Sequence, residues 1–231
     1  MRKLGLIGGM SWASTELYYR HLNKSVNKAR GGLSSAPLLI ESLDFADIAR
    51  ARSEDDWARV AQVLIASAQR LEAAGAGAIL IAANSMHRVA REVEAAIGIP
   101  LLHIAEAVGK ALKADKVGCV AIVGTANVMA EGWYRRRLMQ YGVKLVAPRD
   151  DRVAEIERII YDELMLGRAT RDAERTMKTF LTNYDQEEVD AVVLASTELR
   201  MIVDPKANVL PIYDSTELHI AMGTQWLLRK P

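Results

Sequence analysis

Cysteine is almost absent from this sequence, because Cys119 is the one thiol among 231 residues. A single thiol cannot form an intramolecular disulfide, and its apolar neighbours in KVGCVAIVG favour a thiol packed in the core. Histidine is scarce as well: the sequence has only four, without an H-x-x-x-H spacing or a paired-cysteine pattern. The sequence therefore gives no support for a bound metal ion, and we expect none.

An excess of charge of one sign is also lacking, because 30 lysines and arginines balance 29 aspartates and glutamates to a net charge of +1. No long-range field then favours a nucleic acid or an anionic membrane, and we expect neither as a partner. Long apolar runs are missing too, since none approaches the roughly 18 residues that a membrane span needs. The opening MRKLGLIGGMS reaches its glycines before the core of a signal peptide could form. We expect a soluble cytoplasmic protein with a small-molecule ligand.

Short apolar runs of strand character are abundant in this chain, which is 50% hydrophobic. The clearest helical segment between them, residues 54 to 74, repeats apolar residues every three or four positions, with Ser53 as its expected cap and Gly75 at its end. Continuous apolar strands that alternate with amphipathic helices predict an α/β fold whose parallel sheets are covered on both faces. The runs lie at residues 4–9, 36–42, 78–83, 99–104, 117–124, 143–148, 191–196 and 209–214.

The two halves of the chain match one another at nearly constant offsets. Aligning LIGGM with IVGTA gives an offset of 116, AILIAANS with AVVLASTE gives 113, and IPLLHI with LPIYD gives 111. Any two α/β domains share such patterns, but ordered matches favour an internal duplication. We expect two similar, pseudo-symmetric domains, each a parallel sheet flanked by helices. The first is formed by residues 1–98 with 214–231, whose closing helix returns to it, and the second by residues 99–213.

Small polar residues follow two matched strands, in IAANSMH at 81–87 and in LASTEL at 194–199. The carboxyl ends of parallel strands are where α/β folds bind ligands. The turns GLIGGMS at 5–11 and IVGTANV at 122–128 follow two further strands, and their backbone N–H groups could meet an anion. A plain tight turn is the alternative for both, because neither is G-x-G-x-x-G or a Walker A loop. The alternative for His87 is a structural hydrogen bond.

Four motifs, GLIGGMSWAST, NSMH, GT at 124–125 and STEL, occur in this order and together resemble the aspartate/glutamate racemase family across essentially the whole chain. The resemblance implies an active site in the cleft between the two domains, in a homodimer that needs no cofactor. It implies an acidic amino acid as substrate, racemised by two-base proton transfer at Cα. Two groups are needed because one removes the proton from one face and the other returns a proton to the opposite face. In the family both groups are typically cysteine thiols.

This chain departs from the family at both thiol positions, with Ala83 at the first and Ser196 at the second. Alanine cannot transfer a proton, and an unactivated serine hydroxyl is far less acidic than a thiol. Ordinary two-thiol racemisation is thus excluded, so the activity is inactivated or altered. Three interpretations stay open: an engineered inactive racemase, a natural relative with one-base chemistry, or a binding protein that has abandoned catalysis.

The resemblance assigns eight further residues to binding the substrate or orienting the reacting groups. Arg50 is an alternative to Arg52, since either guanidinium could hold a carboxylate, and helix capping is the alternative for Thr197 and Glu198. Other functions to consider are a one-base lyase or isomerase acting on a malonate, a maleate or a hydantoin, and a non-catalytic sensor of acidic amino acids. A nucleotide-binding regulator is the weakest, because no phosphate fingerprint is present. The eight residues are Met10, Ser11, Arg52, Asn84, Ser85, Thr125, Thr197 and Glu198.

Overall fold

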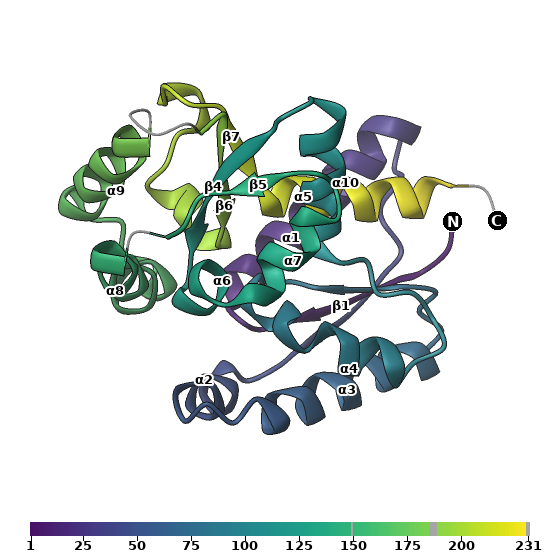
Figure 1. The fold of residues 1–231 in the computed structure, drawn as a ribbon. Coiled ribbons are helices and arrows are strands. Elements are labelled where there is room, and N and C mark those ends of the chain that lie inside the picture. The colour runs from purple at the N-terminus through teal and green to yellow at the C-terminus, as the bar shows by residue number, and fades with distance from the viewer. Residues whose placement is uncertain (149, 185–188, 230–231) are drawn as a thin grey trace. The chain divides into compact units, whose positions relative to one another are not determined.

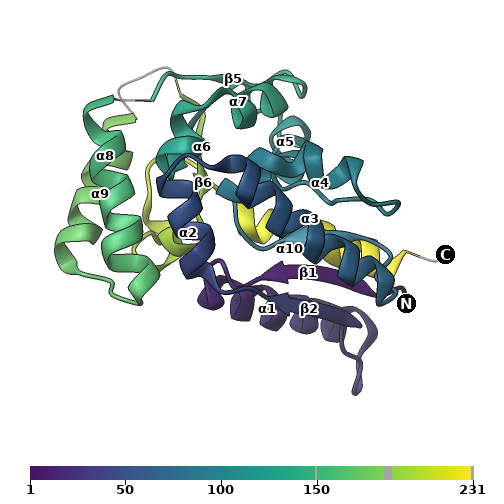
Figure 2. The ribbon, with the colours of Figure 1, turned by 90° about the horizontal axis from the view of Figure 1, so that it is seen from below.

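The computed structural model describes residues 1–148, 150–184 and 189–229, and Figures 1 and 2 show the chain in two views. The chain divides into two compact units. Unit 1 comprises Met1–His103 and His219–Pro231, and unit 2 comprises Ile104–Leu218. The boundaries expected from the sequence, at residues 98/99 and 213/214, each lie five residues earlier than those of the units.

Unit 1 is built on three parallel strands in the order β2-β1-β3, which are β1 (Leu4–Gly8), β2 (Leu38–Ser42) and β3 (Ile79–Ile81). A parallel bridge between Ile79 and Leu101 continues the pairing beyond β3. The helical segments of this unit are α1 (Trp12–Arg30), α2 (Phe45–Ser53), α3 (Trp57–Ala73), the 3-10 turn η1 (Ser85–Val89) and α4 (Ala90–Ala95).

Strands β1 and β3 of this sheet are buried on both faces, since successive side chains of a strand point to opposite faces and all of theirs are buried. Leu4 and Leu6 of β1 pack into one apolar cluster with Tyr18 of α1. Ile7 of β1 belongs to a second cluster, with Leu64 of α3. Figure 2 shows α1 and α3 on opposite sides of β1. Burial on both faces explains why these strands are continuous apolar runs in the sequence.

Unit 2 contains four parallel strands in the order β5-β4-β6-β7. They are β4 (Cys119–Gly124), β5 (Lys144–Leu145), β6 (Ala191–Ala195) and β7 (Ile212–Asp214). Its helices are α5 (Ile104–Ala114), α6 (Ala126–Ala130), α7 (Gly132–Met139), α8 (Asp150–Arg158) and α9 (Arg171–Asn183). Shorter turns are the π-helical η2 (Ile159–Glu163) and the 3-10 segments η3 (Leu164–Leu166), η5 (Thr197–Met201) and η6 (Pro205–Ala207).

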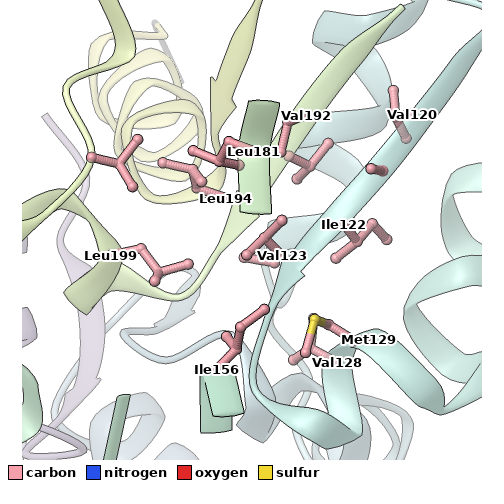
Figure 3. Packing of buried hydrophobic residues seen from close by; sticks show 14 of the residues in the cluster. Val120, Ile122, Val123, Val128, Met129, Ile156, Leu181, Val192, Leu194 and Leu199 are labelled. Atoms are coloured by element: carbon pink, nitrogen blue, oxygen red, sulfur yellow. The ribbon is translucent and has the colours of Figure 1, made fainter. Parts of the chain in front are cut away.

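Helices lie on both sides of this second sheet, with α5 and α7 on one side and α8 and α9 on the other in both views (Figures 1 and 2). One apolar cluster fills the space between strands and helices. Figure 3 shows Val123 of β4 within this cluster, together with Leu194 of β6 and Ile156 of α8. The last helix, α10 (Ser215–Leu228), belongs to unit 1 from His219 onward, as expected for the closing segment.

The two units repeat one hydrogen-bonding pattern. In unit 1 the Ile79 amide donates to the carbonyl of Pro100 at 2.9 Å, and in unit 2 the Val192 amide donates to the carbonyl of Pro211 at 2.9 Å. These are equivalent positions in the sequence alignment of the halves. The strand order is also repeated, since β2-β1-β3 followed by the bridge at Leu101 corresponds to β5-β4-β6-β7. The predicted α/β fold of two similar units with parallel sheets is confirmed.

Membrane insertion finds no support in these helices. Among the described residues, none of the helices is both long enough and apolar enough to cross a bilayer.

Candidate active site

The end of β3 carries three of the residues predicted for the site, namely Ala83, Asn84 and Ser85, and all three are buried. The carbonyl oxygen of Ala83 lies 2.8 Å from Nδ1 of His87, one turn further along the chain. A carbonyl oxygen only accepts, so Nδ1 of His87 carries the proton of this bond. The structural hydrogen bond considered for His87 is therefore present.

Asn84 has a buried side-chain amide without a hydrogen-bond partner among the described residues. Its side chain is 4% exposed, and neither Oδ1 nor Nδ2 has a hydrogen-bond partner among the described residues. Burying an amide without hydrogen bonds costs about 1–3 kcal/mol on mutational scales. Unsatisfied buried side chains of this kind are uncommon, and a site that binds a ligand is one setting in which the cost is recovered. Asn84 is the strongest sign of a ligand site in unit 1.

The glycine turn after β1 is held by its own residues. The amide of Gly9 donates to Oγ1 of Thr15 at 2.7 Å, and Ser11 caps α1 by accepting from the amide of Ser14 at 3.4 Å. Met10 is buried in the apolar cluster that contains Ile7. These contacts account for the turn as a local structure, and a role of Met10 and Ser11 toward an anion stays a prediction.

Arg50 and Arg52, the two guanidinium candidates, both lie near the end of α2. Arg50 forms an exposed ion pair with Asp47 at 2.5 Å. Arg52 is less exposed than Arg50 and does not share that ion pair. The difference in burial keeps Arg52 as the candidate for contact with a ligand.

The end of β6 brings Ser196 and Glu198 together. The hydroxyl of Ser196 donates a hydrogen bond of 2.9 Å to Oε2 of Glu198, and the two residues are 5% and 8% exposed. Thr197, between them, accepts a bond of 3.3 Å from the hydroxyl of Thr216. Ser196 stands at the N-cap position of η5 without a side-chain capping bond. The side chains at this strand end therefore bond to other side chains, and Ser196 does not cap η5.

The end of β4 carries Thr125, which is buried and donates from Oγ1 to Oδ1 of Asn127 at 2.6 Å. Gly124, just before it, leaves no room for a side chain, because a Cβ there would lie 2.6 Å from the carbonyl oxygen of Ala195. The glycine thus allows β4 and β6 to approach closely where both strands end. Thr125 and Ser196 consequently emerge from neighbouring strands of one sheet.

Asp214, at the end of β7, is an acidic residue that was not predicted for the site. Its Oδ1 accepts from the amides of Thr216 and Glu217, and its Oδ2 lies 3.1 Å from Nη1 of Arg200. Burial raises the pKa of Asp214, and the charge of Arg200 opposes that rise. Burial raises the pKa of the Tyr134 phenol as well, with a smaller contribution from the charge of Asp214. The sequence could have indicated Asp214, because it is a polar residue directly after an apolar run, like the residues predicted at the other strand ends.

Three of the four histidines gather in unit 1, which sequence spacing did not indicate. The ring centroid of His87 lies 4.7 Å from that of His103 and 5.4 Å from that of His219. His219 is fully buried between the hydroxyl of Tyr18 and the carbonyl of Leu102. Burial lowers the pKa of His219 to about 3. Among the described residues, no group of three or more His, Cys, Asp or Glu side chains could hold a metal ion.

A cavity of about 560 Å³ opens in unit 2, between α9 and the segment 200–208. Lys178 and Glu174 of α9 line it together with Arg200 and Asp204. Among its described lining residues, none is a residue predicted for the site. We place the candidate site at the strand ends rather than in this cavity, because the buried polar contacts are there.

Comparison with known proteins shows relatives along the whole chain. A Yersinia pestis protein named as an Asp/Glu racemase has a solved structure with a TM-score of 0.92 and 36% identity, covering 99% of this chain and 100% of that chain. An aspartate racemase homologue from Pyrococcus horikoshii OT3 has a TM-score of 0.83 and 28% identity, covering 99% and 100%. The broad specificity amino-acid racemase RacX of Bacillus subtilis (strain 168) is 23% identical over 163 residues, 70% of this chain and 69% of that protein.

The family-level comparison agrees with these relatives. The model of the family described as Asp/Glu/Hydantoin racemase matches residues 7–223, which include both polar strand ends, the second glycine turn and the first one from Ile7 onward. The resemblance noted in the sequence is thereby confirmed: this chain belongs to the Asp/Glu/Hydantoin racemase family.

Proposed function

We propose that this chain binds an acidic amino acid, aspartate or glutamate, and transfers protons at its Cα. The observation that supports this most strongly is the family match over residues 7–223, combined with buried polar residues at the matched ends of β3 and β6. Ala83 and Ser196 are proposed as the two proton-transfer positions. A thiol at each would give the two-base reaction of a racemase, and their replacement alters that reaction in this chain.

The substrate-binding roles follow from the same proposal. Asn84 offers an amide whose donor and acceptor are both available for a substrate carboxylate or ammonium group. Arg52 is proposed to hold a carboxylate, with Met10, Ser11 and Ser85 beside the first strand end. Thr125, which follows β4, and Thr197, which follows β6, are proposed to contact the substrate from unit 2. Binding of the substrate between the two domains stays a prediction, as do the homodimer, the absence of a cofactor and the cytoplasmic location, which rest on the family resemblance.

A second candidate is a one-base lyase or isomerase of the same family. The asymmetry between the two positions favours it, because Ala83 has no proton to give while Ser196 has one. A malonate could lose CO2 and take a proton from one side only, and such a reaction needs no second base. Release of CO2 from malonates, or a change of double-bond geometry in maleate, would distinguish this candidate from a racemase.

Restoring the thiols tests the proposal. We expect the double variant Ala83→Cys with Ser196→Cys to interconvert L- and D-aspartate or glutamate, measured by chiral chromatography, with α-proton exchange in D2O followed by NMR. Ala82→Cys with Ser196→Cys is the matched control, because Ala82 packs in the cluster on the opposite sheet face from Ala83. If the restored thiols produce neither binding nor exchange of any acidic amino acid, the proposed substrate class is wrong.

A further inference from the structure

We propose that Glu198 is the proton acceptor for Ser196, so that the two residues together act as a single base on one face of the substrate Cα. This inference rests on the proposed function, because it assigns the substrate contact to Ser196. It goes further by naming a carboxylate that takes up the hydroxyl proton, which serine releases far less readily than a thiol does. The predicted outcome is a chain that exchanges the α-proton of an acidic amino acid without racemising it at the same rate.

The geometry of the pair carries the inference. Oγ of Ser196 and Oε2 of Glu198 are 2.9 Å apart, with the serine hydroxyl as donor. This separation lies within the roughly 2.6–3.2 Å at which a base activates a neighbouring nucleophile or acid. Both residues are buried, so water competes little with the bond. The pair sits at the end of β6, in the place where the family carries a thiol.

A serine hydroxyl alone is a poor base, because its alkoxide forms only at very high pH. A carboxylate that already accepts a hydrogen bond from the hydroxyl changes this, since the hydroxyl proton can move to Oε2 as Oγ takes another proton from the substrate. Ser196 needs no free alkoxide at any stage of such a transfer. The contact with Glu198 therefore allows Ser196 to act as a base, an ability that the change from thiol to hydroxyl would otherwise remove.

Two other acids of unit 2, Asp214 and Glu217, make ion pairs with Arg200. Asp214 accepts two backbone amides at the start of α10 and pairs with Arg200. Glu217 also pairs with Arg200, at 2.9 Å. Glu198 is the acid whose carboxylate accepts the hydrogen bond from the Ser196 hydroxyl. The structure thus favours Glu198 over Asp214 and Glu217 as the acceptor.

The transfer balances as follows. The Cα–H bond of the substrate breaks, its proton forms a new O–H bond at Oγ of Ser196, and the electron pair stays on Cα and its carboxylate. At the same time the original Ser196 proton leaves Oγ and forms an O–H bond at Oε2 of Glu198. The reverse transfer returns a proton to the same face of Cα. In D2O the returned proton is a deuteron once the pair has exchanged with solvent.

Inversion needs a proton from the opposite face, and the residue assigned to that task is Ala83. Its methyl group has no exchangeable proton, so this position cannot supply one. Retention with exchange is therefore expected to exceed inversion.

The experiment measures α-deuterium incorporation and inversion separately, for L- and D-aspartate and L- and D-glutamate in D2O, by NMR and chiral chromatography. Variants are Glu198→Gln, Ser196→Ala, their combination, and Glu174→Gln as an exposed-acid control. We expect each single variant to lose about 100-fold or more of the exchange rate, while calorimetry shows substrate affinity within about threefold. Because residues that act as a unit are not additive, the double variant should be no slower than the slower single one.

Chemical rescue separates a proton acceptor from a structural role. Glu198→Ala removes the carboxylate, and added formate should restore part of the exchange in this variant but not in Ser196→Ala. Exchange in Glu198→Gln at the rate of the unaltered chain overturns the inference while leaving the proposed function intact. Substrate binding without any exchange overturns the inference together with the proposed proton transfer, and leaves only the proposed binding of an acidic amino acid. Failure of the unaltered chain to bind any of the four amino acids overturns the proposed function itself, and this inference falls with it.

Discussion

The hydroxyl of Tyr18 and Nδ1 of His219 lie 2.7 Å apart, although the two residues are 201 positions apart in the sequence. Nε2 of His219 lies 2.6 Å from the carbonyl oxygen of Leu102, which can only accept, so Nε2 carries the proton. Neutral Nδ1 is then the acceptor, and Tyr18 donates to it. Since His219 belongs to α10 and Tyr18 to α1, this bond fixes the last helix of the chain to the first within unit 1.

Replacing Tyr18 with phenylalanine should destabilise the protein. The change removes the hydroxyl that donates to Nδ1 of a fully buried ring, and an unsatisfied buried polar group costs about 1–3 kcal/mol. Urea unfolding at pH 7 measures the effect. Tyr19→Phe is the control, because that neighbouring ring is 52% exposed, and its unfolding free energy should not change. Equal stability of both variants would show that the Tyr18 bond contributes nothing.

His219 should make the stability of the protein depend on pH below neutrality. Burial lowers its pKa to about 3 in the folded chain, whereas an unfolded histidine titrates near 6.5. The unfolded state therefore binds the extra proton first, and stability falls as the pH decreases from about 6.5 toward about 3. This residue should contribute a slope of about 1.4 kcal/mol per pH unit in that window.

The matched pair for this measurement is His219→Gln and His21→Gln, compared by urea unfolding at several pH values between 4 and 7. Loss of the slope is expected only in the first, because His21 is not fully buried. A slope unchanged in His219→Gln would mean that another group titrates.

Strands β1, β3, β4 and β6 were predictable from sequence because each is a short apolar run that is almost wholly buried. The duplication was predictable because the two halves match in order at nearly constant offsets. Helix boundaries were less so. The helix expected over 54–74 begins at Trp57, and its cap is Asp56, which accepts from the amide of Arg59, rather than Ser53. The expected capping by Ser53 is wrong because α2 continues to that residue. Ser53 and Asp56 are only three positions apart, and both residue types are favoured at the N-cap, so this preference alone could not decide between them.

The candidate site was predictable in part. Strand ends located Asn84 and Ser196, because a change from apolar to small polar residues marks where a buried strand emerges. The histidine cluster was not predictable, since His87, His103 and His219 come together only through folding. The same holds for the ion pair of Arg200 with Asp214, which joins two separate strand ends. Contacts made by tertiary structure leave no periodic signal in the sequence.

Gly9 should tolerate no side chain. Its φ is +88°, and a Cβ there would lie 2.0 Å from the carbonyl oxygen of Leu43. Gly9→Ala therefore combines backbone strain with a clash against main chain, and we expect a loss of about 3 kcal/mol or more. Gly31→Ala is the control: φ is +72° but no heavy atom lies within 4 Å, so the strain alone should cost about 1–2 kcal/mol. Thermal unfolding of the two variants should separate them, and equal losses would contradict the clash.

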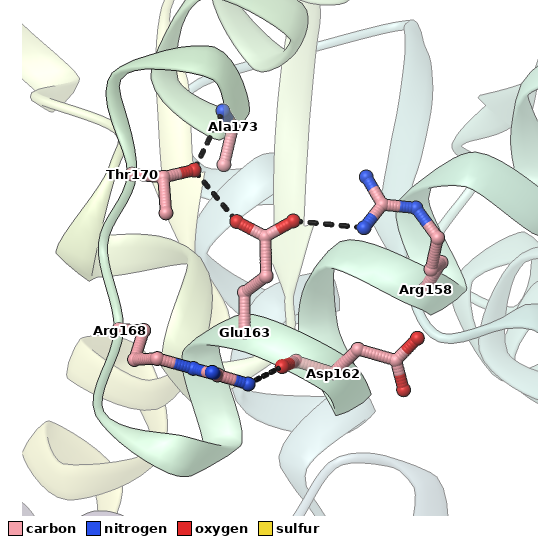
Figure 4. A network of polar contacts seen from close by, with 6 residues as sticks. All are labelled: Arg158, Asp162, Glu163, Arg168, Thr170 and Ala173. Atoms are coloured by element: carbon pink, nitrogen blue, oxygen red, sulfur yellow. Dashed lines mark hydrogen bonds and ion pairs between the residues drawn. The ribbon is translucent and has the colours of Figure 1, made fainter.

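Thr170 joins two stabilising contacts, which Figure 4 shows together. It caps α9 by accepting from the amide of Ala173 at 3.1 Å, and it donates to Glu163 at 2.6 Å. Thr170→Ala should cost about 1 kcal/mol through the lost cap, measured by urea unfolding. Thr179→Ala, at an exposed position on the same helix, should cost less than half as much.

The cost of Thr170→Ala should also depend on pH. The hydroxyl of Thr170, followed by the guanidinium of Arg158, lowers the pKa of the Glu163 carboxyl. The stabilisation is then fully present above the ordinary range of a glutamate pKa and is lost as the pH falls through the lower folded value. The difference between the unaltered chain and the variant should therefore be larger at pH 7 than at pH 3. A difference that grows toward pH 3 would contradict this sign.

Asn84 should contribute more to the affinity for a ligand than to the free energy of unfolding. Both polar atoms of its amide are buried without a hydrogen-bond partner among the described residues, so the folded chain gains nothing from them and pays their desolvation. Asn84→Ala should leave the unfolding free energy within about 1 kcal/mol of the unaltered value, because the lost packing and the relieved desolvation oppose each other.

Asn23 provides the matched comparison for Asn84, since its amide donates to the carbonyl of Tyr19 and accepts from the amide of Ala36. Asn23→Ala should lose about 1–2 kcal/mol and keep the stabilisation that L-aspartate or L-glutamate gives in a thermal-shift experiment. Asn84→Ala should show the opposite pattern, with stability kept and the ligand-induced shift lost. If Asn84→Ala unfolds more readily than Asn23→Ala and still responds to the amino acid, the amide of Asn84 serves the fold instead of a ligand, and the site would have to be sought among the remaining strand-end residues.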